Sequence, residues 1–155
     1  MSEELNKIFE KVKLVFGVED KNISDINMTN NDGENALHLA VRWEAIEAVK
    51  LLLREGININ QPGDLGHTPL HEACSIGNLE ITKILVENGA DLFALTEGNP
   101  PFTLARFSGS DHICDYLAIE MKKTQEQDPH IWVRARIKQL KAEIQRLESR
   151  LETSS

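Results

Sequence analysis

The 155-residue sequence predicts an all-α fold, a solenoid of helix–turn–helix units followed by a single long C-terminal amphipathic helix. Three observations predict it. Residues 66–91 carry the start and stop signals of two short helices, similar residues recur at an interval of 33, and residues 129–155 carry an apolar seam at coiled-coil spacing. Because helices of about ten residues cannot bury their apolar faces alone, the units must pack against one another.

The central unit contains its own helix boundaries. Thr68 is suited to cap a helix, and Pro69 is suited to its first position, where the missing N–H costs nothing. Gly77 supplies a break, and Gly89 ends the second helix. The apolar residues expected to face inward are Leu70, Ala73, Cys74, Leu79, Ile81, Ile84, Leu85 and Val86.

The same pattern precedes and follows the central unit. Residues 33–40 match residues 66–73 at an interval of 33, and Gly56 precedes Gly89 by the same interval. Residues 98–105 repeat the pattern at an interval of 32, as a diverged closing unit. A fixed period in this range is the signature of a stacked solenoid.

Residues 68–73 are Thr-Pro-Leu-His-Glu-Ala, which match the motif Thr-Pro-Leu-His-x-Ala, and residues 89–91 are Gly-Ala-Asp. On these motifs, residues 24–120 resemble the ankyrin repeat family. The resemblance implies that a partner protein binds the concave surface and the loop tips. The first full repeat departs from the pattern twice. Asn-Ala at 35–36 replaces Thr-Pro, which is expected to weaken the helix start, and Glu44 stands where Gly77 stands one period later. If that turn needs a left-handed backbone, a residue other than glycine there costs about 1 kcal/mol. The alternative is a tighter or altered turn between the helices over residues 42–45.

The chain divides into four expected parts. Residues 1–29 form an N-terminal capping helix and a loop, as a degenerate unit at one end of the stack. The repeats occupy residues 30–123 (about 30–61, 62–94 and 95–123), a linker occupies 124–128, and a coiled-coil-like helix occupies 129–155. The capping helix over 3–16 places Leu5, Ile8, Phe9, Val12, Val15 and Phe16 on one side, Gly17 ends it, and residues 18–24 look like an inserted loop.

The C-terminal helix is expected to begin with Asp128 as its N-cap and Pro129 in its first position. Its heptad seam consists of Val133, Ile137, Leu140, Ile144, Leu147 and Leu151. In a parallel homodimer Arg136 would face Lys141 and Glu143 would face Glu148, whereas an antiparallel register pairs Lys141 with Glu148 and Glu143 with Arg150. The charges therefore favour antiparallel self-association. Pairing with a helix of another protein and docking on the repeats remain as alternatives.

Charge and composition exclude several classes of function. The formal net charge of the whole chain is −8. The residues before Thr124 carry a net charge of −9, with 11 Lys or Arg against 20 Asp or Glu, and the residues from Thr124 onward carry +1. An acidic body of this kind does not suit a nucleic-acid partner, which needs clustered cations, but it suits a basic protein. No apolar stretch has the length of a membrane helix. Two cysteines 40 residues apart, with no metal-type spacing, indicate a cytoplasmic, reducing environment.

The sequence offers no catalytic constellation, metal-ligand cluster or cofactor motif, so a non-enzymatic protein is expected, with no cofactor. His38 and His71 recur at one repeat position. This recurrence favours a structural role, in hydrogen bonds between successive loops, over a role as ligand or base. Cys74 and Cys114 are expected to be small buried hydrophobes.

The candidate partner surface combines the ends of the first helices with the loop tips, which the resemblance marks as exposed. An apolar strip of Trp43, Ile76 and Phe107, with Leu65 nearby, is expected to lie on the concave side with acidic residues beside it. The full set is Asp32, Glu34, Arg42, Trp43, Asp64, Leu65, His67, Ile76, Glu97 and Phe107.

These residues predict a protein–protein interaction module, in which the C-terminal helix mediates oligomerisation or a second contact. The alternative function is an inhibitor or immunity protein that blocks a basic enzyme or toxin, which the acidic body would suit. A competing structural interpretation is that Ile131 and Trp132 of the C-terminal helix cover the strip.

Overall fold

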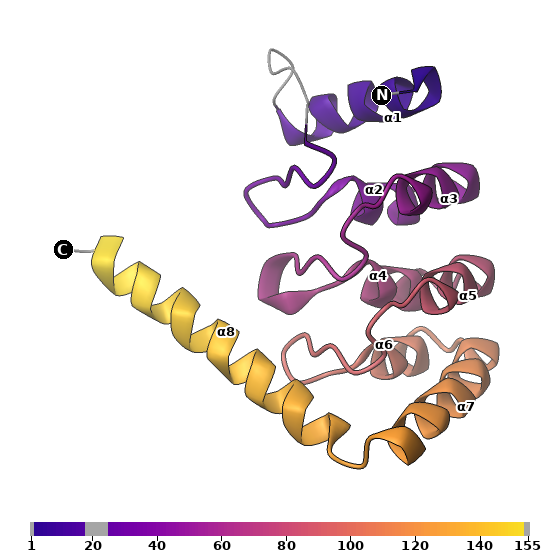
Figure 1. Ribbon diagram of the computed structural model, residues 1–155, viewed down its shortest axis with the longest axis vertical. Coiled ribbons are helices and arrows are strands. Elements are labelled where there is room, and N and C mark those ends of the chain that lie inside the picture. The colour runs from indigo at the N-terminus through magenta and orange to yellow at the C-terminus, as the bar shows by residue number, and fades with distance from the viewer. Residues whose placement is uncertain (1, 18–24, 154–155) are drawn as a thin grey trace.

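The computed structural model describes residues 2–17 and 25–153 as successive helical layers, with one long helix running from the last layer across the loops (Figure 1). The predicted all-α solenoid with a long C-terminal helix is confirmed. A single helix forms the first layer and three helix pairs follow. The elements are α1 (Glu3–Phe16), α2 (Ala36–Arg42), α3 (Ile46–Arg54), the short turn η1 (Asp64–Gly66), α4 (Pro69–Ile76), α5 (Leu79–Glu87), α6 (Pro101–Phe107), α7 (Asp111–Gln127) and α8 (Ile131–Thr153).

The helix boundaries follow from the capping residues. Thr68 caps α4 in a reciprocal arrangement with His71, and Gly77 ends the helix with φ = 84°. The expectation that Asn35 weakens the start of α2 is wrong. The Asn35 side chain accepts a hydrogen bond from the Leu37 N–H, because asparagine caps a helix as well as threonine does.

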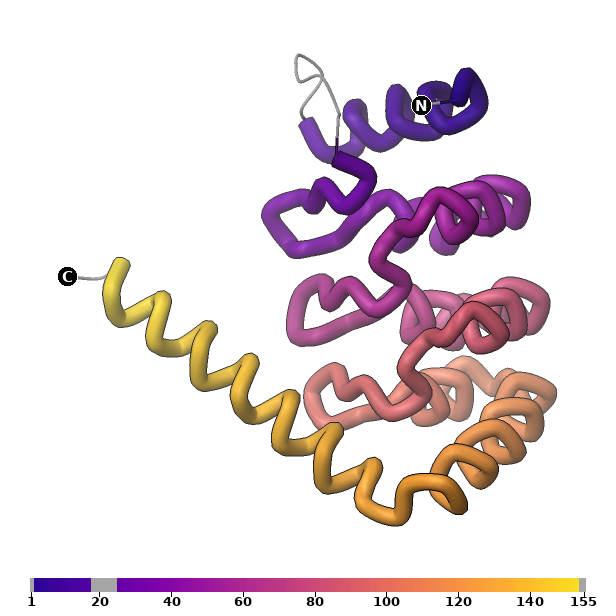
Figure 2. Tube along the Cα trace, in the orientation of Figure 1, coloured from indigo at the N-terminus to yellow at the C-terminus, as the bar shows by residue number. Residues whose placement is uncertain are grey.

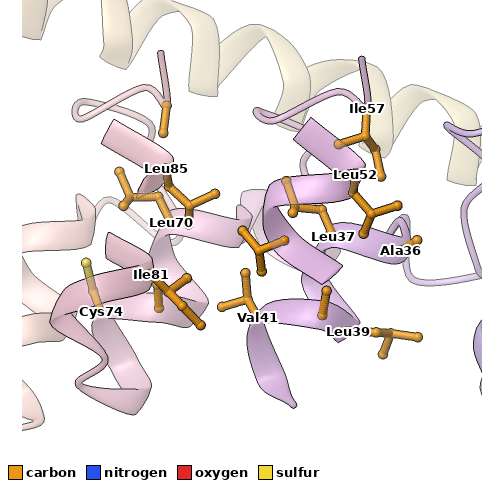
Figure 3. Packing of buried hydrophobic residues seen from close by; sticks show 14 of the residues in the cluster. Ala36, Leu37, Leu39, Val41, Leu52, Ile57, Leu70, Cys74, Ile81 and Leu85 are labelled. Carbon is orange, nitrogen blue, oxygen red and sulfur yellow. The ribbon is translucent and has the colours of Figure 1, made fainter. Parts of the chain in front are cut away.

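The core is continuous from layer to layer. Leu37 and Leu70 occupy equivalent inward positions and are fully buried (Figure 3). Phe102 packs against the same cluster and is half-buried. The first layer joins this core through Leu5, Phe9 and Val12, which are the buried residues of α1. Val15 was expected on the same face, but it is 56% exposed, since the inward stripe of α1 is narrower than predicted.

The loops stack as closely as the helices do. A Cβ atom on Gly33 would lie 2.9 Å from the Pro62 carbonyl oxygen, and one on Gly66 would lie 2.7 Å from the Leu95 carbonyl oxygen. Both glycines have a positive φ. Successive loops therefore approach each other through positions where no side chain fits.

Hydrogen bonds between repeats follow the 33-residue period. Asn27 Oδ1 accepts from the Asn58 N–H at 2.6 Å, and one repeat later Asn60 Oδ1 accepts from the Asp91 N–H at 2.7 Å. His38 also bonds the next repeat, because its Nε2 donates to the His67 carbonyl at 3.1 Å. The repeats are joined by polar as well as apolar contacts.

In the part of the chain that the structure describes, three residues other than glycine adopt the left-handed backbone, namely Glu44 (φ 51°), Leu65 (φ 53°) and Glu97 (φ 49°). Of the two turns considered after α2, the structure has the left-handed one at Glu44. Leu65 and Glu97 were not expected to adopt this backbone, and both lie at loop tips directly before a glycine with positive φ. A backbone of this kind costs about 1 kcal/mol for a residue with a Cβ atom.

The C-terminal boundary differs from the prediction. Residues 124–127 of the predicted linker belong to α7, which runs to Gln127 because its hydrogen bonds continue to the Asp128 N–H. Asp128 Oδ1 accepts from the His130 N–H at 3.1 Å, as an N-cap does, and the regular helix begins at Ile131 rather than Pro129. The predicted inserted loop at 18–24 lies outside the described residues. Among the described helices, none is both long and apolar enough to cross a membrane.

Candidate functional site

The first helices of the three pairs, α2, α4 and α6, lie next to one another and form what we call the inner-helix face. Large apolar side chains lie exposed where these helices end. Trp43 is 41% exposed, Ile76 is 38% exposed and Phe107 is 81% exposed. Trp43 and Ile76 are equivalent by the 33-residue period, whereas Phe107 falls one position earlier in its repeat. We call these three residues the helix-end row.

A chain of charged groups crosses the inner-helix face. The Arg42 guanidinium donates to Glu34 Oε1 at 2.6 Å and to Glu72 Oε1 at 2.8 Å. His67 Nδ1 lies 3.7 Å from the other Glu72 oxygen. Arg42 therefore joins two repeats, and its charge is balanced by two carboxylates that are themselves largely buried.

The pKa values of this network follow from burial and pairing. Burial opposes ionisation of Glu34, but hydrogen bonds from Arg42 and Asn30 outweigh it, so the pKa of Glu34 is lowered. The two carboxylates raise the pKa of Arg42 above its usual value. Burial lowers the pKa of His67, although the Glu72 charge opposes this. The network therefore holds one guanidinium between two carboxylate side chains.

The loop tips carry the remaining acidic residues of the predicted surface. Asp32, Asp64 and Glu97 are exposed at successive tips, and Leu65 is 41% exposed beside Asp64. Each tip precedes its inner helix, while the helix-end row follows it. Leu65 therefore lies at the opposite end of α4 from Ile76. The prediction that Leu65 lies near the apolar strip is wrong.

The terminal helix α8 does not cover the helix-end row, so that competing interpretation is wrong. Trp132 instead packs edge-to-face on Phe93, with ring centroids 4.8 Å apart. From there α8 runs alongside the loops and draws away from the stack towards its C-terminal end (Figure 2). The groove between α8 and the loops is lined by loop residues and by α8, and not by Trp43, Ile76 or Phe107.

The predicted seam of α8 is exposed along its whole length. The exposed fractions are 58% for Val133, 45% for Ile137, 41% for Leu140, 55% for Ile144, 51% for Leu147 and 71% for Leu151. Residues from other faces of the helix make the contacts with the stack, among them Ile131 and Ala135, which pack against the core. One seam residue, Leu147, also lines the groove beside the loops, so the predicted alternatives of docking and self-association concern largely different faces of α8.

The recurring histidines have the structural role that the sequence predicts. His71 is fully buried, accepts at Nδ1 from the Thr68 N–H at 3.1 Å, and donates through Nε2 to the Asn99 carbonyl at 3.1 Å. Burial lowers the pKa of His71 to about 4. Cys74 is fully buried, and burial raises the pKa of its thiol to about 12, while Cys114 is only partly buried. Within residues 2–17 and 25–153, no group of three or more His, Cys, Asp or Glu side chains is placed to hold a metal ion.

Sequence reasoning missed three features of this region. Glu72 binds Arg42 but was not among the predicted residues. Glu44 accepts a hydrogen bond from the Asn78 side chain at 2.8 Å, which ties the turn after α2 to the next repeat. Asp64 lies 4.0 Å from Arg146 of α8. Each joins residues about 30 or more positions apart, and only the 33-residue period offered a signal for the first two.

Comparison with known proteins identifies the repeats. A family model described as ankyrin repeats, three copies, matches residues 4–95 and 61–129, which is more than half of the chain. A putative ankyrin repeat protein of Acanthamoeba polyphaga mimivirus is 44% identical over 68 residues, which are 44% of this chain and 9% of that protein. The human neurogenic locus notch homolog protein 1 is 41% identical over 81 residues, 51% of this chain and 3% of the relative. The mouse RelA-associated inhibitor is 38% identical over 76 residues, 49% of this chain and 9% of the relative. The chain thus spans only a small part of the length of these relatives.

Proposed function

We propose, from the premise that this chain belongs to the ankyrin repeat family, that its inner-helix face binds a partner protein carrying apolar and basic side chains. Ankyrin repeats are protein–protein interaction modules and are generally not enzymes. The observation that carries the proposal is the exposure of Trp43 and Ile76 at equivalent ends of neighbouring inner helices. Bulky apolar side chains on a polar surround are typical centres of binding energy.

The charges at the loop-tip end of the inner helices favour a basic partner. The acidic side chains at the loop tips, Asp32, Asp64 and Glu97, are exposed. Arg42 is bound by both Glu34 and Glu72, so it adds little free positive charge. Charge complementarity would mainly speed association and select the partner, while apolar contacts supply most of the affinity.

A protein that inhibits a basic enzyme or toxin is the second candidate. The net charge of −8 favours it, because a basic active-site region would be attracted to the acidic loop tips. One relative carries the word inhibitor in its name, although the two proteins share only a short segment. This candidate predicts loss of enzymatic activity in the partner upon binding, whereas a module that only recruits the partner leaves the activity unchanged.

The exposed seam of α8 is a second association surface in this proposal, for oligomerisation or for a second contact. A cytoplasmic, reducing location is also part of it. The buried thiol of Cys74 and the partly buried thiol of Cys114 are both free, and such thiols persist where disulfide formation is disfavoured.

Replacement of both Trp43 and Ile76 by Asp tests the proposed surface. The intact chain is immobilised, bound proteins are identified by mass spectrometry, and the dissociation constant of each recovered partner is measured with purified protein. The double substitution is expected to raise the dissociation constant of a true partner at least 100-fold. The thermal unfolding midpoint should stay within a few degrees of the wild-type value, since both side chains are exposed.

Leu14 on α1 and Ile119 on α7 provide the matched control, because they are 65% and 57% exposed and lie away from the inner-helix face. The variant with both replaced by Asp should bind as the wild type does. Equal loss of binding in the two double variants, or retention in both, would show that the helix-end row does not select the partner.

A further inference from the structure

The helix α8 has two faces with different chemistry. Ile131 and Ala135 pack against the core. The residues of α8 that line the groove beside the loops are Ala135, Arg136, Lys138, Gln139, Ala142, Glu143, Arg146 and the seam residue Leu147. At 3.6 residues per turn, the mean direction of these stack-facing residues lies about 135° from that of the seam residues. The contacts that hold α8 on the stack therefore leave most of the seam directed away from it, with Leu147 at the edge of the groove.

The contacts on the docked face are strongest at the start of α8. Trp132 packs on Phe93, whereas Lys138 Nζ lies 3.7 Å from Asp91 and Arg146 lies 4.0 Å from Asp64. Exposed ion pairs at such distances stabilise weakly. The aromatic contact fixes the position of the helix, and the ion pairs orient its later turns along the loops.

We propose that the seam pairs with the seam of a second copy of this chain in antiparallel orientation, while each α8 stays docked on its own stack. The inference rests on the second association surface proposed above and names its partner. The resulting order is stack, helix, helix, stack. Each inner-helix face stays open, so the assembly presents two partner sites.

Charge complementarity selects the orientation. With Ile144 packed against Leu147 of the second copy, Lys141 lies beside Glu148 of that copy, and the symmetric pair repeats the contact. A parallel pair would instead place Lys141 beside Arg136 of the second copy. An antiparallel pair shifted by one heptad, which would cover the whole seam, places Lys141 beside Lys141 of the second copy. Only the first of these three registers gives Lys141 an acidic neighbour.

The selected register has a definite extent. Leu140, Ile144, Leu147 and Leu151 of each copy form its apolar layers, while Val133 and Ile137 lie outside the overlap. Four layers are few for a coiled coil, so the dimer forms reversibly and its population depends on concentration.

Sedimentation velocity of the full chain from 5 to 500 μM, at low and high salt, tests the dimer. The wild type should shift from monomer to dimer over this range. Ile144→Asp should raise the dimer dissociation constant about 100-fold or more, and Ile119→Asp, a matched change at a 57% exposed isoleucine, should leave it unchanged. A wild type that stays monomeric at 500 μM, or a dimer insensitive to Ile144→Asp, overturns the proposal without affecting the inner-helix face.

Charge reversal tests the register, because its sign differs between the arrangements. Lys141→Glu should weaken the proposed dimer about tenfold, and adding Glu148→Lys should restore it. In the parallel arrangement, Lys141→Glu turns the like-charge contact with Arg136 of the second copy into an attractive one and strengthens association. In the shifted antiparallel arrangement it replaces a Lys–Lys contact by a Glu–Glu contact and leaves association nearly unchanged. Either result would refute the register. Lys122→Glu on α7 makes the same change in net charge outside the seam and should have no effect.

The fluorescence of Trp132 tests whether α8 stays docked in the dimer. Trp43→Phe leaves Trp132 as the single tryptophan, since the chain has two. Iodide quenching of Trp132 should be equal in the dimer of this variant and in its monomeric Ile144→Asp form. Stronger quenching in the dimer would mean that pairing releases α8 from the stack, and would overturn simultaneous docking.

Discussion

Protonation of His71 is expected to destabilise the repeat stack at acidic pH. The neutral ring accepts a hydrogen bond at Nδ1 from the Thr68 N–H and donates at Nε2 to the Asn99 carbonyl, so a proton added at Nδ1 would face a donor. The ring is fully buried, and this burial lowers its pKa from 6.5 to about 4. Folding therefore favours the neutral form of the ring. If the protonated ring turns away from the Thr68 N–H, its hydrogen bond to the Asn99 carbonyl is weakened as well.

The magnitude follows from linkage. The pKa is lower in the folded state than in the unfolded state, so the stabilisation is fully present above pH 6.5 and is lost as the pH falls from 6.5 to about 4. A shift of this size corresponds to roughly 3 kcal/mol, because each pKa unit is worth about 1.4 kcal/mol. The pKa of His38 is also lowered by burial, so it acts in the same direction and over the pH range below 6.5.

Two measurements check this expectation. The pKa of His71 is obtained by NMR titration of its Cε1–H signal, and the free energy of unfolding is obtained from urea denaturation between pH 7.5 and 4.5. The difference between wild type and His71→Gln should shrink by roughly 3 kcal/mol as the pH falls. His112→Gln, at an exposed position, is the control and should parallel the wild type. A His71 signal that titrates at pH 6 or above would refute the reasoning, even if His71→Gln does not fold.

Two further predictions concern packing. Gly66→Ala should lower the free energy of unfolding, measured by urea denaturation, by about 2 kcal/mol or more, since the new Cβ would lie 2.7 Å from the Leu95 carbonyl oxygen. Gly98 has the same φ of 85° but no atom within 4 Å of a Cβ, so Gly98→Ala should lower it by only about 1 kcal/mol. Trp132→Ala should free α8 from the Phe93 ring, which hydrogen exchange would detect as faster exchange in α8 but not in α4. Unchanged exchange in α8, or equal costs at the two glycines, would contradict these predictions.

Local signals in the sequence determined the repeats. Thr68, Pro69 and Gly77 set the ends of α4 through capping and backbone preference, and these forces act between residues at most four positions apart. The recurrence of the histidine motif at 33 residues predicted that His38 and His71 bind neighbouring loops, because equivalent positions in a stack have equivalent neighbours. The end of α7 was predicted four residues too early, because the polar composition of residues 124–127 favours a linker although they continue the helix.

Only the tertiary structure decided how the surfaces divide. The heptad spacing marked the seam of α8, and Ile131 and Trp132 indicated an apolar start of the helix, but nothing in the sequence indicated that Lys138 and Arg146 face the loops. The contact between Trp132 and Phe93, and the bond from Arg42 to Glu72, join residues about 30 or more positions apart. Such contacts depend on how neighbouring repeats and the last helix are placed in space, which periodicity alone does not specify.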